Sequence, residues 1–261
     1  MEKIIRNDRI NPGGTIFNRI RQCLAYADDV AILGRKGGYI KRTLEEMVAI
    51  TQQIGLQIND TKTKYMINRQ DGNKVKENEL MGKIYEKVES SKYLGAVMRS
   101  LNEIETEIKS KNAVGNKRYY ALGPIIKRST SQSIKIHLYK MIIRPAVTYG
   151  ADTWTLTSKI EKMLITWERK ILRKIYGPTK ENGQWRIKTN EELRTKYKSP
   201  DIVTVIKIRR LEWLGHVSRM NETRSVVKIF EGKLQGRRGR GRPRLRWINN
   251  VEDDLRKLSV K

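Results

Sequence analysis

Two adjacent aspartates, Asp28 and Asp29, lie between two short runs of strand-like composition, residues 23–26 and 30–33. This pattern predicts a β-hairpin with both carboxylates at or beside its tip. Acidic groups in an apolar hairpin are costly unless they face water or a cation, and Mg²⁺ takes oxygen ligands from one or two carboxylates together with substrate phosphates. The chemistry that such a pair can serve is phosphoryl transfer assisted by divalent cations.

The adjacency of the two aspartates limits what they can do alone. Neighbouring side chains on an extended strand point to opposite faces, so one carboxylate can lead and a further one from a neighbouring strand is needed to complete a two-metal site. The alternative interpretation of Asp28 and Asp29 is an ordinary solvated hairpin turn.

The charge of the chain indicates a polyanionic partner. Its 261 residues carry a formal net charge of +27, and the pI is about 10.2. We expect nucleic acid, because each phosphate that a protein neutralises releases a counterion. An anionic membrane surface is the alternative, but the sequence has no long basic segment with a continuous apolar face.

The composition argues against several other classes of protein. Cys23 is the only cysteine, which excludes an internal disulfide. Because His137 and His216 are the only histidines, a Cys/His zinc site is not expected. The chain has no apolar run of about 18 residues that could span a membrane and no signal-peptide core, so a nuclear or cytoplasmic location is expected.

Hydrophobic periodicity changes at about residue 100. Before this point we expect short strands at 15–17, 23–26, 30–33, 56–58, 64–67 and 92–95, a polar hairpin at 74–89, and one helix at 39–54 that Gly55 ends. After it we expect helices at 102–122, 131–149, 157–176, 190–197, 201–219 and 247–258. Pro145 is expected to interrupt or end the second of these helices. The third has the clearest apolar stripe, with Glu168 off it, and residues 179–189 are expected to form a loop.

Motifs follow one another along the whole chain. In the first hundred residues they are 14–17, the hairpin 24–35, 55–59 with 62–66, and 93–95. In the helical part they are Tyr139, Arg144-Pro145, Tyr149-Gly150, Trp154, 168–173, 210–220 and the Gly/Arg-rich stretch before Trp247. In this order they resemble the reverse transcriptase of non-LTR (LINE-type) retrotransposons, an RNA-directed DNA polymerase.

The resemblance implies roles for particular residues. Asp28 and Asp29 would be the catalytic carboxylates that hold Mg²⁺, and the partners would be an RNA–DNA template–primer and dNTPs. Nucleotide or primer contacts would come from Tyr26, Lys62, Lys64, Tyr93, Leu94 and Gly95. The alternatives are a solvated strand end for the two lysines and a core strand with a glycine-permitted bend for residues 93–95.

The resemblance also implies an α+β fold in three parts. Residues 1–100 would be the C-terminal part of a polymerase palm, 101–180 a mainly α-helical thumb-like region, and 181–261 a basic helical C-terminal region with a Gly/Arg-rich segment. In the family another palm aspartate and the fingers precede the hairpin. The chain is therefore expected to be a fragment of the enzyme that is inactive alone.

The densest basic run supplies candidate nucleic-acid-binding residues, namely Arg237, Arg238, Arg240, Arg242, Arg244 and Arg246. Within it, Arg240-Gly241-Arg242-Pro243 resembles an AT-hook core, in which an extended Arg-Gly-Arg segment lies in the narrow minor groove of A·T-rich DNA. The alternative is a basic tail that binds phosphates of any sequence.

Two rival interpretations of the whole chain stay open at this point. One is a non-catalytic nucleic-acid-binding protein, either a remnant or a co-opted one, in which the hairpin around Asp28 and Asp29 is only structural. The other is a remnant with no selected role.

Overall fold

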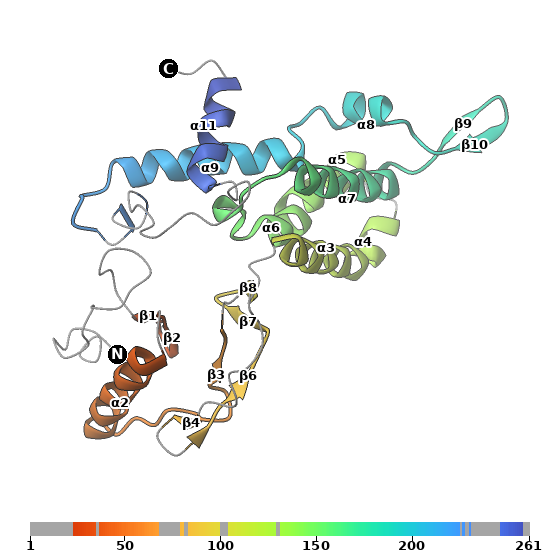
Figure 1. The fold of residues 1–261 in the computed structure, drawn as a ribbon. Helices are drawn as coiled ribbons and strands as arrows, with labels where there is room; N and C mark the ends of the chain where they lie inside the picture. Colours follow the sequence, from red (N-terminus) through yellow and green to blue (C-terminus); the bar gives the residue numbers. More distant parts are fainter. Residues whose placement is uncertain are drawn as a thin grey trace. The chain divides into compact units, whose positions relative to one another are not determined.

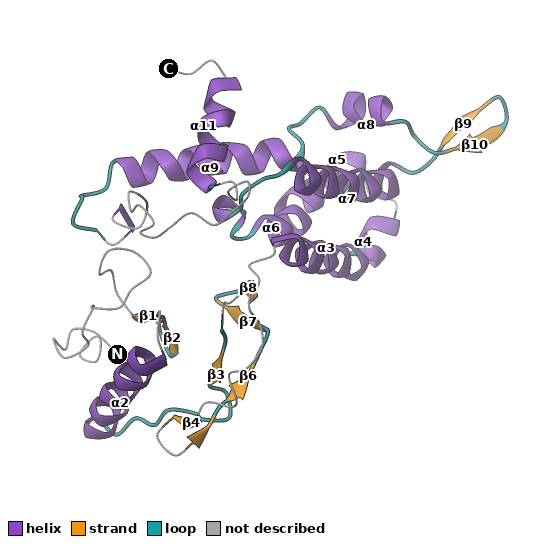
Figure 2. Cartoon of the chain, in the orientation of Figure 1, coloured by secondary structure: helices purple, strands orange, loops and turns teal. Residues whose placement is uncertain are grey.

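Short strands and one helix make up the described part of the first hundred residues, and helices make up most of the remainder (Figure 2). The structure describes residues 23–34, 37–67, 79–80, 83–99, 104–128, 131–224, 226–227, 230 and 246–257. Contacts divide the chain into two units, Met1–Asn102 with Val217–Gly241 (unit 1) and Glu103–His216 with Arg242–Lys261 (unit 2). The strand predicted at 15–17 lies outside the described residues.

The hairpin predicted around the aspartate pair forms in this computed structural model of the protein (Figure 1). Strand β1 (Cys23–Tyr26) pairs antiparallel with β2 (Asp29–Ile32), and a two-residue turn joins them. Cys23 of the hairpin is buried against Met47 of helix α2 (Gly37–Gln53). The hairpin therefore has one face on a helix and one face turned away from it.

Gly55 ends helix α2, as predicted. Its φ of 73° lies in the left-handed region that favours glycine. The N–H of Leu56 donates to the carbonyl of Thr51 at 2.9 Å, and the N–H of Gly55 donates to the carbonyl of Gln52 at 3.2 Å. This pair of bonds is the Schellman arrangement that closes a helix C-terminus. It leads into residues 56–58 without forming the strand that we predicted there.

The other strands of unit 1 are short and pair in twos. Strand β3 (Lys64–Tyr65) is parallel to β6 (Glu86–Lys87), and β4 (Glu79–Leu80) is antiparallel to β5 (Lys83–Ile84). Strand β7 (Ser90–Tyr93) forms a hairpin with β8 (Ala96–Arg99). Leu94 and Gly95, which we predicted as strand, instead form its turn at φ of 47° and 80°.

Helices dominate unit 2. They are α3 (Ile104–Ala121), α4 (Gly123–Lys127), α5 (Gln132–Leu138), α6 (Arg144–Thr148), α7 (Ser158–Tyr176), α8 (Asn190–Tyr197), α9 (Ile202–Ser218) and α11 (Trp247–Lys257). Two shorter segments are the π-helix η1 (Tyr139–Ile143) and the 3₁₀-helix η2 (Ala151–Thr153). None of the helices in the described ranges is long and apolar enough to cross a lipid bilayer.

One hydrophobic core runs through unit 2 and across residue 180, where we had predicted a boundary between parts. Ile108, Ile143 and Leu164 from before that point are buried in the same cluster as Leu193 and Ile206 from after it. Residues on either side of 180 therefore share one packed interior.

The helix interruption predicted at Pro145 takes the form of a short π-helical segment, in which the helix is wider than an α-helix. The N–H of Arg144 donates to the carbonyl of Tyr139, five residues earlier, so η1 is a π-turn that joins α5 to α6. Pro145 is the second residue of α6, and its missing N–H leaves a carbonyl of the preceding turn without a helical donor.

The loop predicted at residues 179–189 is wrong over residues 179–186, which form a hairpin. Strand β9 (Thr179–Glu181) pairs antiparallel with β10 (Gln184–Arg186), and Asn182 and Gly183 form the turn at φ of 48° and 82°. Asn-Gly between two strands is a strong hairpin signal, because both turn positions need positive φ.

The sequence pattern of helix α7 predicts that Glu168 lies off the buried apolar stripe, and this prediction is wrong. Glu168 is buried and only 2% exposed. Its carboxylate accepts a hydrogen bond from the Tyr139 hydroxyl at 2.6 Å and one from the N–H of Ile202 at 2.9 Å. Burial raises the pKa of this carboxyl, although both hydrogen bonds act in the opposite direction.

Candidate metal-binding and nucleic-acid-binding residues

The hairpin presents the two aspartates from different backbone positions. Asp28 lies in the turn, whereas Asp29 is the first residue of β2 and pairs with Tyr26 across the hairpin. Cross-strand partners share a face, and side chains alternate along each strand. Tyr26, Asp29 and Leu24 are therefore on the face opposite to Cys23, and Tyr26 is 66% exposed. Both carboxylates are exposed, so a hydrated cation can reach them.

Tyr93 connects the hairpin β7–β8 to the hairpin β1–β2. Its hydroxyl donates to the carbonyl oxygen of Leu24 in β1 at 3.3 Å, although the two residues are 69 positions apart. Burial raises the pKa of the Tyr93 hydroxyl, and the charges of Asp29 and Cys23 add to the rise. The structure thus brings together three of the predicted site residues, Tyr26, Asp29 and Tyr93.

Leu94 and Gly95 form the tip of this second hairpin. Leu94 is 40% exposed and has a φ of 47°, which a side chain with a Cβ adopts only at a cost of roughly 1–2 kcal/mol. A two-residue hairpin turn requires positive φ at both of its positions, so the turn itself accounts for this conformation. The primer contact that the resemblance implies for residues 93–95 stays a prediction.

The two predicted lysines differ in their surroundings. The ammonium group of Lys64 forms an ion pair with Glu86 at 2.9 Å, across the parallel pair β3–β6. Lys62 lies in a turn in which its backbone N–H donates to the Asn59 side chain at 3.1 Å, and its own side chain is exposed. Within the described ranges, neither lysine is hydrogen-bonded or ion-paired to the aspartate pair.

The two aspartates have no third metal-ligating neighbour in the part of the chain that the structure describes. No group of three or more His, Cys, Asp or Glu side chains that could hold a metal ion occurs there. Two exposed carboxylates fit one hydrated Mg²⁺ completed by substrate phosphates, but a second cation needs a further carboxylate.

The Arg-rich run is described only at its end. Arg237, Arg238, Arg240, Arg242 and Arg244 lie outside the described residues. Arg246 is exposed directly before α11, and its carbonyl accepts the N–H of Asn250 at 3.1 Å. The AT-hook interpretation of this run stays a prediction.

A basic groove on unit 2 was not predicted from the sequence. It has a volume of about 660 Å³ and lies along α7 beside α3. Apolar side chains, Met163, Trp167 and Ile171, form part of its lining. The polar and basic lining residues are Asn112, Asn116, Lys159, Lys162, Thr166, Lys170, Arg173 and Lys174. The cationic side chains of α7 and the amide groups of α3 suit the phosphates of a nucleic-acid backbone.

The cations of the groove are held to different degrees. Lys159 is paired with Glu105 at 2.7 Å, whereas Arg173 donates to the carbonyl of Lys188 at 3.0 Å. Lys174 donates to the Tyr120 hydroxyl at 2.7 Å and lies 4.6 Å from the centre of that ring. The exposed Lys162 and Lys170 have no acidic partner among the residues that the structure describes. These two lysines are the groove's available phosphate ligands.

The sequence does carry a signal for this groove. Lys159, Lys162, Lys170 and Lys174 recur at helical spacing along α7, on the side away from its buried apolar stripe. A strongly basic chain supplies many such lysines, however, and only the packing of α3 beside α7 turns this row into a groove.

Comparison with known proteins gives one informative likeness. A transposon-derived protein of Caenorhabditis elegans, itself uncharacterized, is 25% identical over 235 residues, which cover 89% of this chain and 84% of that protein. No family model and no solved structure matches the chain. The likeness indicates that the chain is of transposon-related origin.

Proposed function

We propose that this chain is the late palm and thumb-like part of a non-LTR retrotransposon reverse transcriptase, an RNA-directed DNA polymerase. The observation that carries the proposal is the exposed pair Asp28 and Asp29 at a two-residue hairpin turn whose other face is packed on α2. The transposon-derived relative supports the transposon origin that this proposal requires.

The proposed roles follow from where each side chain lies. Asp28 and Asp29 would hold Mg²⁺, which in phosphoryl transfer activates the attacking hydroxyl and offsets the developing charge on the phosphate. Tyr93 and the tip at Leu94 would position the primer end, since the Tyr93 hydroxyl is bonded to β1. Lys62 would reach a phosphate of the incoming dNTP. Lys64 is the less suitable lysine, because Glu86 already neutralises it.

Unit 2 would hold the template–primer. The groove along α7 offers Lys162 and Lys170 to an RNA–DNA backbone. Phosphate contacts of this kind fix the position of a duplex without reading its sequence, which is what a polymerase requires.

We expect the 261 residues alone not to extend a primer. The described residues contribute two carboxylates at the hairpin and no third ligand, and two-metal catalysis needs a further one. A segment that carries another aspartate would have to be supplied for polymerase activity.

The second candidate function is a non-catalytic nucleic-acid-binding protein of transposon origin. The observation that favours it is the basic groove of unit 2, whose lining includes no residue of the aspartate hairpin. On this alternative the nucleic acid binds as before, and the hairpin holds no metal.

Metal binding separates the two candidates. Titration of Mn²⁺ by electron paramagnetic resonance, with an RNA–DNA template–primer present, is compared for the wild type, Asp28→Asn and Asp29→Asn. Asp253→Asn is the matched control, because Asp253 is a half-exposed aspartate on α11 that is paired with Arg256. We expect each hairpin variant to lose about tenfold or more in Mn²⁺ affinity, since one carboxylate of a two-carboxylate site is removed, while the control is unchanged. Equal Mn²⁺ affinity in all four proteins, with template–primer still bound, would replace the polymerase proposal by the alternative.

A further inference from the structure

Hairpin β9–β10 has two chemically different faces. Thr179 pairs with Arg186 and Glu181 with Gln184, so these four side chains share one face. Lys180 pairs with Trp185 and both lie on the other face. Figure 1 shows the hairpin projecting beyond α7 and α8 of the same unit.

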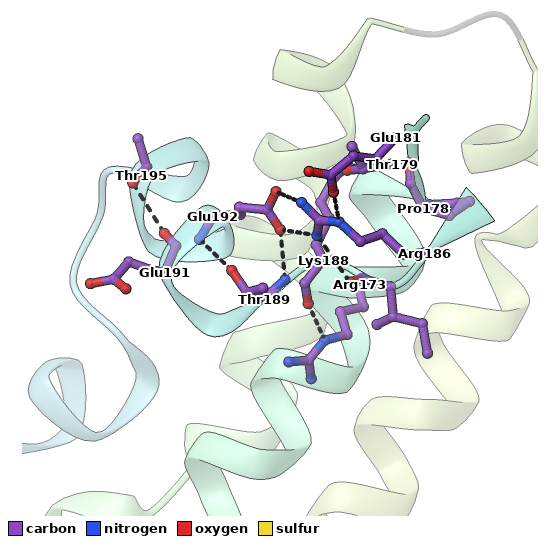
Figure 3. A network of polar contacts seen from close by, with 11 residues as sticks. Arg173, Pro178, Thr179, Glu181, Arg186, Lys188, Thr189, Glu191, Glu192 and Thr195 are labelled. Atoms are coloured by element: carbon purple, nitrogen blue, oxygen red, sulfur yellow. Dashed lines mark hydrogen bonds and ion pairs between the residues drawn. The ribbon is translucent and has the colours of Figure 1, made fainter. Parts of the chain in front are cut away.

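The first face anchors the hairpin to α8. The guanidinium of Arg186 donates to both carboxylate oxygens of Glu192, at 2.9 Å and 2.8 Å, and is also paired with Glu181 (Figure 3). Glu192 in turn accepts the N–H of Thr189 at 2.7 Å, which completes a capping box at the start of α8. Arg186 is the largest cause of a pKa for Glu192 of about 2.

The root of the hairpin is fixed to α7 as well. The ammonium group of Lys188, whose side chain is buried, donates to the carbonyl of Pro178 at 3.1 Å and to the Thr179 hydroxyl. Arg173 of α7 donates to the carbonyl of Lys188 at 3.0 Å (Figure 3). These bonds hold the projecting strands in one position relative to the helices of unit 2.

The second face leaves large apolar groups in water. Trp185 is 69% exposed, and Ile187, which follows at the next outward position, is 73% exposed. Lys180 is the cross-strand partner of Trp185, and the Cβ atoms of such partners are about 4.5–5.5 Å apart. The acidic Glu181 is on the opposite face and is already paired with Arg186. This face therefore combines a flat aromatic ring, an aliphatic side chain and a cation without a neighbouring anion.

We propose that this face binds single-stranded nucleic acid, with an unpaired base stacked on the Trp185 indole and a neighbouring phosphate on the Lys180 ammonium group. The partner follows from charge complementarity: a protein of net charge +27 presents a cation next to the ring. Aromatic platforms with adjacent cations bind single strands because every unpaired base has a π-face, whereas the bases of a duplex are already stacked on one another. The proposal rests on the nucleic-acid partner of the proposed function but assigns a different site.

Fluorescence anisotropy of labelled oligonucleotides tests the platform in the full chain. Affinities for single-stranded RNA, single-stranded DNA and a blunt duplex of the same length are measured for the wild type, Trp185→Ala, Trp185→Phe and Lys180→Ala. Met141→Ala is the matched control, because Met141 is a 63% exposed apolar residue on η1 rather than on the hairpin. Circular dichroism checks that each variant is folded.

We expect Trp185→Ala to weaken single-strand binding about 5- to 30-fold, the lower part of the range for losing one base–aromatic stack. Trp185→Phe keeps an aromatic ring and should stay within about threefold of the wild type. Lys180→Ala should reduce the slope of log affinity against log salt concentration by about 0.7, the value for one phosphate contact on a single strand. Duplex affinity and the Met141→Ala variant should not change.

Three outcomes would overturn the platform. Single-strand affinity that is unchanged in Trp185→Ala removes the stacking role and leaves the proposed function standing. If Trp185→Ala changes the oligomeric state measured by sedimentation equilibrium but leaves single-strand affinity unchanged, the hairpin is a contact between copies of the chain. A wild-type chain that binds no nucleic acid removes the platform and the proposed function together.

Discussion

Replacing Gly115 by alanine should destabilise the protein, although alanine is the better helix former. Gly115 is buried in α3, and an added Cβ would lie 2.5 Å from Trp167 Cζ2 and 2.5 Å from Val147 Cγ2. Neither neighbour can yield easily. Val147 is fully buried, and the indole N–H of Trp167 donates to Asn116 at 3.0 Å.

The sign of the effect follows from two opposing magnitudes. Glycine to alanine inside a helix ordinarily stabilises by about 0.5–1 kcal/mol. Overpacking a filled core costs about 1–3 kcal/mol, and two simultaneous contacts favour the upper half of that range. The expected net loss is roughly 1–2 kcal/mol, which corresponds to a melting temperature lower by about 2–8 °C for a chain of this size.

Urea unfolding of unit 2, followed by tryptophan fluorescence, measures the loss. Ser110→Ala, an exposed position in the same helix, is the control and should stay within about 0.5 kcal/mol of the wild type. Adding Val147→Ala removes one of the two clashing groups, so the double variant should be more stable than the sum of the single losses predicts, by about 0.5 kcal/mol or more. Equal or higher stability of Gly115→Ala, or strict additivity with Val147→Ala, would refute this account of the packing.

Two further predictions concern ion pairing and the groove. Arg186 and the N–H of Thr189 lower the pKa of Glu192 to about 2 from its usual 4.5, so this carboxylate stabilises the fold above about pH 4.5, and the contribution is lost as the pH falls through about 2. The difference in unfolding free energy between the wild type and Glu192→Gln should therefore shrink over that interval, and an unchanged difference in urea titrations at pH 6 and 2.5 contradicts it. The double charge reversal Lys162→Glu with Lys170→Glu should weaken template–primer binding about tenfold or more at moderate salt and flatten its salt dependence. The same change at Lys257, at the end of α11, should have a smaller effect. If Lys257→Glu weakens binding as much per charge, net charge alone accounts for the affinity.

Local patterns predicted the elements whose causes are local. The runs on either side of Asp28 and Asp29 predicted β1 and β2, and the apolar stripe of α7 predicted that helix between Thr157, which caps it, and Gly177, which ends it. The hairpin β9–β10 has an equally local cause in Asn182-Gly183. The residues around this turn are mostly polar and lack the alternation of a half-buried strand, so periodicity alone predicts a loop.

Other features depend on residues far apart in the sequence, which no local pattern carries. Glu168 looks like a solvent-facing charge in its helix, and only the approach of the Tyr139 hydroxyl and the N–H of Ile202 makes its burial tolerable. The core shared across residue 180 has the same origin. A change in composition along the chain does not reveal that α8 and α9 complete the core begun by α3.

At the candidate metal site, the structure adds spatial relations that the motifs do not contain. Motif order alone gave Tyr26, Asp29 and Tyr93 as separate predictions, and the structure brings them together through the Tyr26–Asp29 pair and the bond from Tyr93 to Leu24. The structure also separates the two predicted lysines. Lys64 is ion-paired with Glu86, whereas Lys62 is exposed. A pair of exposed carboxylates binds a cation weakly until a phosphate completes its coordination. Metal affinity of this chain should therefore rise when template–primer and nucleotide are present together, and metal binding that ignores both would count against a role of the hairpin in polymerisation.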